Sequence, residues 1–232
     1  MFAAAHAHRR WLMEGFMYRF HPQLPEARRR IAAGDIGRPL HIECRYLSTI
    51  PKDSGPHFWP EAGGGSLMDL GCYGVDLCRF LAAGEPARVT AQAHYDEATG
   101  VDLTFHGQLH YDQGLVAQFA CSFESEGAYG AEIVGTEAKL TIPHPWRPPT
   151  WPAELVITRR GVPEPIRIDA PDGPAHPMAP FALEIEHFSQ CVRQNRPPVF
   201  PPDTDAEQDS RANLRVIEAL HSAAHTHQPT VP

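Results

Sequence analysis

Strand-like segments follow one another along most of the chain, and this succession limits the possible fold more than any other feature of the sequence. Several segments alternate apolar and polar side chains, as around Ala117, Phe119 and Cys121. Period-two alternation is typical of a strand with one buried face and one face open to water. We therefore predict one large open sheet, mainly antiparallel and covered on one face. The segments are residues 39–50, 87–95, 101–111, 114–124, 129–134, 137–142, 153–159 and 165–169.

Helical patterns interrupt the strands once and then follow them. Apolar spacing and stop signals predict helices over residues 23–33, 66–82, 181–193 and 206–226. A Pro-rich stretch at residues 196–202 separates the last two helices. Strands interrupted by one helix and followed by terminal helices indicate an α+β fold, with the helices on one face of the sheet.

The first residues show a different pattern. Residues 2–10 predict a helix, and the apolar run at 11–18 predicts a buried strand. A buried parallel strand needs neighbouring strands, which so short a preceding segment cannot supply. We therefore interpret residues 1–22 as the end of a larger unit and residues 23–232 as the α+β domain.

Composition argues against several classes of partner. The formal net charge is -8, so the chain offers no basic field for nucleic acid. Its longest apolar runs fall short of the roughly 18 residues of a membrane span. The cysteines are odd in number and lack a CxxC pair, which favours reduced thiols in the cytoplasm. His221 and His225 have helical spacing without the carboxylate of an HExxH motif, so no metal site is predicted.

The most informative segment, residues 63–76, reads GGGSLMDLGCYGVD. Its glycines allow a tight turn close to a ligand, and Ser66 can cap the helix that begins there. Asp69 and Tyr73 are four residues apart, so a regular helix places both on one face, where they could meet a substrate hydroxyl. The alternative is structural: a carboxylate favoured by the helix dipole and a tyrosine of the core. The segment does not match the GxGxxG of a nucleotide site.

Five motifs occur in order along the chain. They are MEGFMYRFHP at 13–22, GDIG at 34–37, GGGSLMDLGCY at 63–73, VGTE at 134–137 and NLRVIEAL at 213–220. Together they resemble the glucose-fructose oxidoreductase/inositol dehydrogenase/MocA family. The resemblance is closest to the branch with dimeric dihydrodiol dehydrogenases, sugar 1-dehydrogenases and anhydrofructose reductases.

This resemblance implies an N-terminal Rossmann domain followed by an α+β domain that builds the substrate pocket and often a dimer interface. Residues 1–22 then correspond to the last Rossmann helix and strand, and residues 23–232 to the substrate and oligomerisation domain. The family pattern makes Tyr73 the acid/base for the group that exchanges hydride, with Asp69 as its partner. Arg19 and Leu70 are implied as substrate contacts, and Trp59 is a further candidate in an aromatic loop.

The chain also departs from the family pattern. The family's lysine in a Glu-Lys-Pro motif has no counterpart, and the few residues before Trp11 cannot form a Rossmann domain. NAD or NADP is implied for full-length members, and we expect neither to bind this chain alone.

The function that follows is the substrate-binding portion of an NAD(P)-dependent oxidoreductase acting on a sugar, polyol or cyclic diol, inactive by itself. The alternative is a non-catalytic binding or assembly module derived from the same family. Exposed apolar surface around Phe16 predicts a homo-oligomer.

Overall fold

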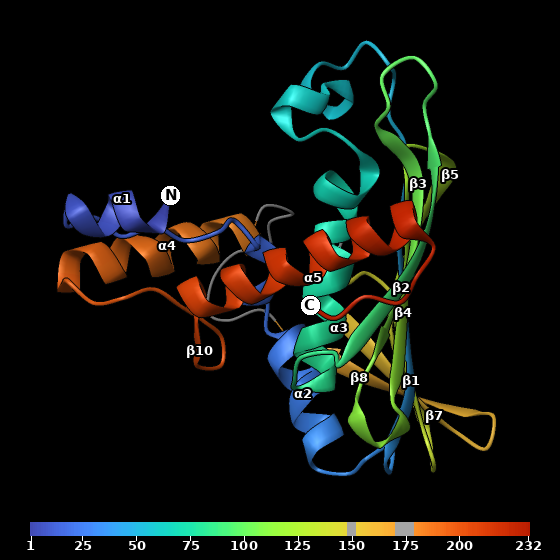
Figure 1. Cartoon of the computed structure of the whole chain (residues 1–232). Coiled ribbons are helices and arrows are strands. Elements are labelled where there is room, and N and C mark those ends of the chain that lie inside the picture. Colours follow the sequence, from blue (N-terminus) through green and yellow to red (C-terminus); the bar gives the residue numbers. More distant parts are fainter. Residues whose placement is uncertain (148–151, 170–178) are drawn as a thin grey trace.

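The central feature of the computed structural model is an eight-stranded sheet in the order β2-β3-β4-β1-β5-β6-β7-β8. The structure describes residues 1–147, 152–169 and 179–232. Figure 1 shows this sheet nearly edge-on. Its strands are β1 Pro39–Thr49, β2 Arg88–Tyr95, β3 Asp102–His110, β4 Val116–Ser122, β5 Glu124–Gly135, β6 Lys139–Ile142, β7 Ala153–Arg159 and β8 Val162–Ile168.

These strands confirm the α+β fold with a large, mainly antiparallel sheet. Only β1 and β4 pair in parallel among the strands of this sheet. A parallel pair requires a crossover, and the chain makes it through helix α3 (Cys72–Ala82) and the β2–β3 hairpin. Two strands begin earlier than predicted. Strand β5 begins at Glu124 and not at residue 129, and β8 begins at Val162 and not at residue 165.

The helices cover one face of the sheet. Figure 1 shows α2 (Gln23–Ala32), α3 and α5 (Ala206–Thr226) on the same side, while α1 (Phe2–Ala7) and α4 (Ala179–Gln194) extend away from the sheet. The alternation along β1 explains this arrangement: Ile42, Cys44 and Tyr46 are buried towards the helices. We call the uncovered side the open face; it carries Glu43, Arg45, Thr90, Gln108 and Gln118.

Short elements complete the described residues. None of the helices there is long and apolar enough to cross a membrane. The remaining elements are the 3-10 turns η1 Met17–Phe20, η2 Pro56–Phe58, η3 Pro60–Ala62 and η5 Asp112–Gly114, the π-turn η4 Leu67–Gly71, and the two-stranded pair β9 Val199–Phe200 and β10 Thr204–Asp205.

The predicted strand at residues 11–18 is wrong. Residues 11–16 form no regular element, and the 3-10 turn η1 follows them. A strand forms only where another strand accepts its ladder hydrogen bonds, and η1 instead contacts helices α4 and α2. The helix predicted before it is confirmed in a shorter form, α1. The division at residue 22 stays a prediction.

A buried network of charged groups joins η1, α3 and α5. The Asp76 carboxylate on α3 accepts a hydrogen bond from Tyr18 and another from Arg19, with Nη1 2.8 Å from Oδ1. Arg19 and Arg79 also pair with Asp209 on α5, at 3.3 and 3.1 Å. Asp76 is 0 % exposed and Arg19 1 %, so water cannot take the place of these partners.

We predict that Asp76→Ala lowers the free energy of unfolding by roughly 3–5 kcal/mol, because it leaves buried guanidinium groups without their carboxylate. Urea denaturation monitored by tryptophan fluorescence measures the change. Glu132→Ala is the matched control, since Glu132 forms a half-exposed ion pair with Lys139 at 2.7 Å and should cost less than about 1 kcal/mol. Equal losses in the two variants would contradict the prediction.

Candidate active site

Tyr73 lies in the first turn of α3, within a cluster of aromatic rings. Its ring centroid is 5.4 Å from that of Phe16, 5.8 Å from Tyr18, 5.7 Å from Tyr46 and 6.0 Å from Trp146. These neighbours come from the N-terminal segment, β1 and the segment after β6. The fold therefore brings aromatic rings that lie far apart in the sequence together around the Tyr73 phenol.

The cluster controls the protonation of Tyr73. Burial, first of all, raises the pKa of the phenol well above its usual value, and Cys72, Tyr46 and Asp69, in that order, raise it further. The positive charge of Arg147 opposes the rise without cancelling it. Tyr73 is thus a neutral phenol whose hydroxyl can donate a hydrogen bond, and its tyrosinate form is disfavoured more strongly than in water.

Asp69 lies in a π-turn and not in the regular helix predicted for residues 66–82. Residues Leu67–Gly71 form this turn, and the α-helix begins only at Cys72. The wider turn alters the i,i+4 alignment with Tyr73 on which the prediction relied. The contact formed by Asp69 is with His57, whose Nδ1 is 3.0 Å from Oδ2. Both side chains stay about one-third exposed, at 36 % and 35 %.

The other predicted site residues lie in different environments. Arg19 is buried in the charge network described above, paired with carboxylates. Leu70 is buried at 6 % exposure, and Trp59 is 53 % exposed, between η2 and η3. The structure thus leaves Asp69 and Trp59 accessible and encloses Arg19 and Leu70. Their roles as substrate contacts stay predictions.

Sequence reasoning missed Tyr46 and Arg147, which lie near Tyr73. Tyr46 stacks on Trp146 with centroids 5.7 Å apart and planes 9° apart. Arg147 follows Trp146 directly and supplies the positive charge felt by Tyr73. The alternation along residues 39–50 could have indicated that Tyr46 faces the helices. Nothing local in the sequence relates Trp146 or Arg147 to α3, because that contact depends on the order of the strands.

Glu14 is a second missed group. Burial is the main cause that raises its pKa to about 7, and the carboxylates of Asp76 and Asp209 add to the rise. One of its oxygens, Oε2, is buried without a hydrogen-bond partner. An acidic residue inside the apolar run at 11–18 was the available signal.

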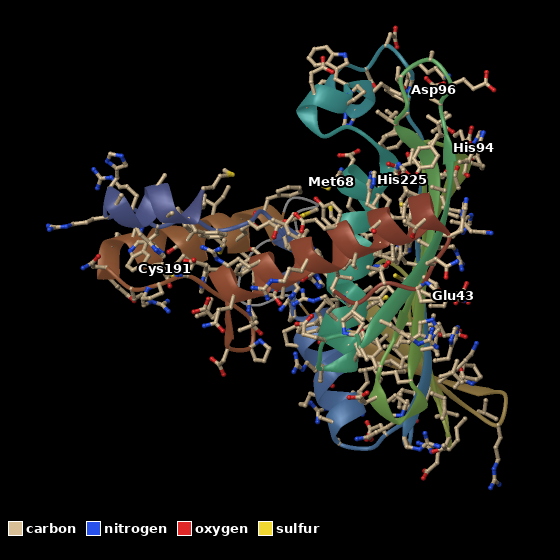
Figure 2. All side chains as sticks on the ribbon, viewed as in Figure 1. Glu43, Met68, His94, Asp96, Cys191 and His225 are labelled. Carbon is tan, nitrogen blue, oxygen red and sulfur yellow. The ribbon has the colours of Figure 1, made fainter. Side chains whose placement is uncertain are left out.

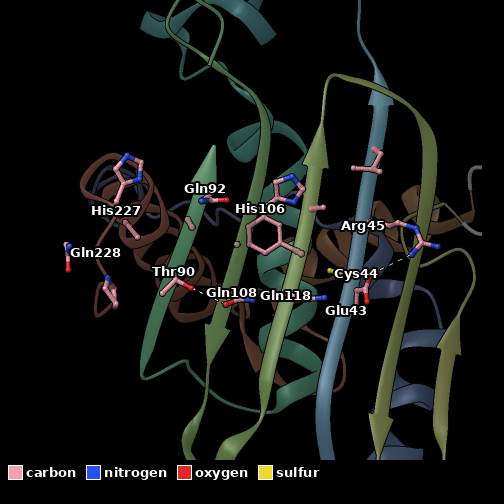
Figure 3. Close-up of a pocket in the computed structure, with 17 residues that line it drawn as sticks. Glu43, Cys44, Arg45, Thr90, Gln92, His106, Gln108, Gln118, His227 and Gln228 are labelled. Carbon is pink, nitrogen blue, oxygen red and sulfur yellow. Dashed lines mark hydrogen bonds and ion pairs between the residues drawn. The ribbon is translucent and has the colours of Figure 1, made fainter. Parts of the chain in front are cut away.

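A groove of about 790 Å³ lies on the open face and does not include Tyr73 or Asp69. Figure 3 shows its floor, where polar side chains project from neighbouring strands. The register aligns Thr90, Gln108, Gln118 and Glu43 in one row across β2, β3, β4 and β1. Among the described residues, no group of three or more His, Cys, Asp or Glu side chains is placed to hold a metal ion.

The fold and the motif-bearing segment agree with one known family. A family model, the GFO/IDH/MocA C-terminal domain, matches residues 25–141. The chain belongs to the Gfo/Idh/MocA family. The match covers the segment with Asp69 and Tyr73 and strands β1 to β5 with most of β6, so the predicted family membership is confirmed.

Curated members of the Gfo/Idh/MocA family resemble almost the whole chain. D-xylose 1-dehydrogenase (NADP(+)) 2 from Haloferax volcanii is 30% identical over 217 residues, which cover 93% of this chain and 62% of that protein. Trans-1,2-dihydrobenzene-1,2-diol dehydrogenase from Mus musculus is 32% identical over 209 residues, 87% of this chain and 60% of that protein. The chain thus spans about three fifths of the length of these relatives.

Solved structures share the fold. The aldose-aldose oxidoreductase from Caulobacter crescentus superposes with a TM-score of 0.84 at 24% identity, covering 100% of this chain and 67% of that chain. A 3-ketoreductase from Actinomadura kijaniata, in complex with NADP and TDP-benzene, has a TM-score of 0.83 at 23% identity, with 96% and 65% covered. These similarities establish the α+β architecture.

Glu14 gives the site region a testable pH dependence. Its pKa is raised from 4.5 to about 7 on folding, so its stabilising contribution is complete below about pH 4.5 and is lost as the pH rises through about 7. We predict that Glu14→Gln increases the free energy of unfolding over wild type by roughly 1–3 kcal/mol at about pH 8 and by much less at about pH 5.

Urea denaturation at the two pH values measures this difference. Glu154→Gln, at an exposed position on β7, is the control and should show little change between them. A Glu14→Gln effect of equal size at both pH values would contradict a buried, titrating carboxyl.

Proposed function

We propose that this chain forms the substrate-binding part of an NAD(P)-dependent oxidoreductase acting on a hydroxyl or carbonyl group of a sugar, polyol or cyclic diol. The observation that supports it most is the Tyr73 phenol, enclosed by aromatic rings and one turn from the partly exposed Asp69 carboxylate. The names of the relatives support the substrate class, since they specify D-xylose, trans-1,2-dihydrobenzene-1,2-diol and scyllo-inositol.

Each group has a distinct task in this proposal. Asp69 accepts a hydrogen bond from a substrate hydroxyl, because an ionised carboxylate is an acceptor only. Tyr73 donates its proton to the oxygen of a carbonyl that is being reduced, and takes the proton back in the oxidation direction. The surrounding rings keep water from the reacting oxygen. The positive charge of Arg147 favours the tyrosinate that forms when the proton leaves.

Bound NAD(P) would supply or accept the hydride, but the described residues do not fit a dinucleotide. A pyrophosphate binds at a glycine-rich helix start with free backbone amides. The glycine-rich start here precedes η4, and the Leu67 amide there already donates to the Asp102 carboxylate at 2.7 Å. A pyrophosphate placed at this helix start would be repelled by the negative charge of the Asp102 carboxylate. We propose that a dinucleotide-binding domain outside these residues provides the cofactor.

Direct binding tests the substrate site. We predict that Tyr73→Phe weakens the binding of D-xylose, scyllo-inositol or trans-1,2-cyclohexanediol about three- to tenfold, because one hydrogen bond contributes about 0.5–1.5 kcal/mol. NMR titration of the chain with each compound gives the affinities. Tyr95→Phe is the control, since its hydroxyl pairs with His225 at 3.3 Å, on α5. Unchanged affinity in Tyr73→Phe for every compound bound by wild type would remove Tyr73 from the site.

We also propose that copies of the chain associate through the open face. The resulting oligomer would be either the enzyme itself or the non-catalytic assembly module that the sequence left as the alternative. This face is hollowed and uncovered, and the family resemblance implies a dimer interface on this domain. We predict that Gln118→Arg, at the centre of the groove, lowers the molar mass measured by light scattering at a fixed concentration. Glu218→Arg, exposed on α5, should leave it unchanged. A wild-type monomer across the concentration range would refute association.

A further inference from the structure

We propose that Asp102 is a positioning residue for the site, holding the turn that presents Asp69 and Tyr73. The role in substrate binding rests on the proposed function, whereas the contacts of Asp102 with residues 65–67 do not depend on any substrate. Asp102 begins β3, far from residues 66–73 in the sequence, and its side chain is 3 % exposed. No sequence pattern pointed to it.

Two short hydrogen bonds connect Asp102 to the start of the π-turn. The Ser66 hydroxyl donates to Oδ2 at 2.7 Å, and the Leu67 backbone amide donates to the same oxygen at 2.7 Å. These bonds to a carboxylate are charge-assisted, and they lie where the helical dipole favours negative charge. Ser66 was expected to cap the helix from within the segment, but its side chain makes no capping bond to the helix. Asp102 caps the helix from another strand.

Asp102 forms no ion pair among the described residues, and the electrostatic effect of His221 on its carboxyl group is weaker than that of the bonds from Ser66 and Leu67. Burial raises the pKa of its carboxyl group, while the bonds from Ser66 and Leu67 act in the opposite direction. A buried carboxylate without a cation is costly unless its oxygens accept hydrogen bonds. The position of residues 66–67 is therefore tied to that of the carboxylate.

Two glycines of the segment are required by close contacts with Asp102 and with the His57 backbone. Gly65 has φ +123°, and a Cβ there would overlap Oδ1 of Asp102. A Cβ on Gly64 would lie 2.6 Å from the carbonyl oxygen of His57. The Gly65 amide donates to that same carbonyl at 2.9 Å. The glycines thus let the backbone fit between Asp102 and the His57 loop.

The connection continues to Asp69. The Asp69 amide donates to the Gly65 carbonyl at 3.1 Å, so the residue that packs on Asp102 also fixes the backbone of Asp69. His57, held by its bond from Gly65, then reaches the Asp69 carboxylate. A displacement at Asp102 is transmitted through residues 65–67 to Asp69 and to the start of α3 at Tyr73.

The test compares Asp102→Asn with Asp96→Asn. Asp96 is a matched control because it lies in the turn between β2 and β3 and is 7 % exposed. Its carboxylate accepts hydrogen bonds from Lys52 at 2.5 Å and Thr99 at 2.9 Å. Figure 2 shows Asp96 and Met68 towards the same end of the sheet. Amide hydrogen exchange and chemical shifts by NMR report on residues 65–73, and titration with the three compounds above reports on binding.

We expect Asp102→Asn to shift the Leu67 amide upfield, to increase its exchange rate at least tenfold and to shift the Asp69 and Tyr73 resonances. We expect Asp96→Asn to leave these signals unchanged. Affinity for a compound that wild type binds should fall at least fivefold in Asp102→Asn only. If Asp102→Asn fails to fold, Ser66→Ala removes one of the two donors and should give smaller changes of the same kind.

The outcomes separate the two proposals. Unchanged resonances of residues 65–73 in Asp102→Asn, or equal changes in Asp96→Asn, would overturn the role of Asp102. Shifted resonances with full affinity would also overturn it, by reducing Asp102 to a structural residue. Shifted resonances in a chain whose wild type binds none of the three compounds would refute the proposed function while upholding Asp102 as the residue that positions Asp69 and Tyr73.

Discussion

The buried ionic network at Asp76 is the interaction on which the arrangement of helices depends. The network joins the N-terminal turn, α3 and α5, three parts of the chain that share no strand pairing. Charged groups removed from water are tolerable only when every partner is in place. This requirement fixes α3 in rotation as well as in position, because Asp76 must face Arg19 while Gly74 packs on Phe119, where a Cβ would lie 3.1 Å from the ring. Tyr73, next to Gly74, is therefore directed into the aromatic cluster.

The aromatic cluster then decides what Tyr73 can do. A phenol in a regular, solvated helix would keep its ordinary acidity, whereas burial among Phe16, Tyr46 and Trp146 raises the pKa of the Tyr73 phenol and disfavours the tyrosinate. A phenol with a raised pKa donates hydrogen bonds but gives up its proton less readily, so positive charge near its oxygen assists any proton transfer. Arg147 supplies a part of this positive charge.

The glycine-rich segment shows how one motif can suggest two different explanations. Glycines before a helix suggest close approach of a ligand, and in many nucleotide sites they have that role. In this chain the groups that come close are the Asp102 carboxylate and the His57 carbonyl. The segment thereby serves the internal architecture of the candidate site.

The sequence by itself determined the order and type of the α-helices and of the eight strands in the large sheet, because alternation along strands and apolar spacing along helices are local properties. It also determined the family, through motifs at 13–22 and 63–73. The prediction of a strand at 11–18 was wrong because a strand forms only beside another strand. The prediction of a regular helix at Asp69 was wrong because the π-turn there depends on the hydrogen bonds from Ser66 and Leu67 to the distant Asp102. Only the tertiary structure decided that Asp69 pairs with His57, that Arg19 is buried with Asp76, and that Tyr46, Arg147 and Asp102 lie near the candidate site. These contacts join segments through strand order and helix packing, which no local pattern encodes.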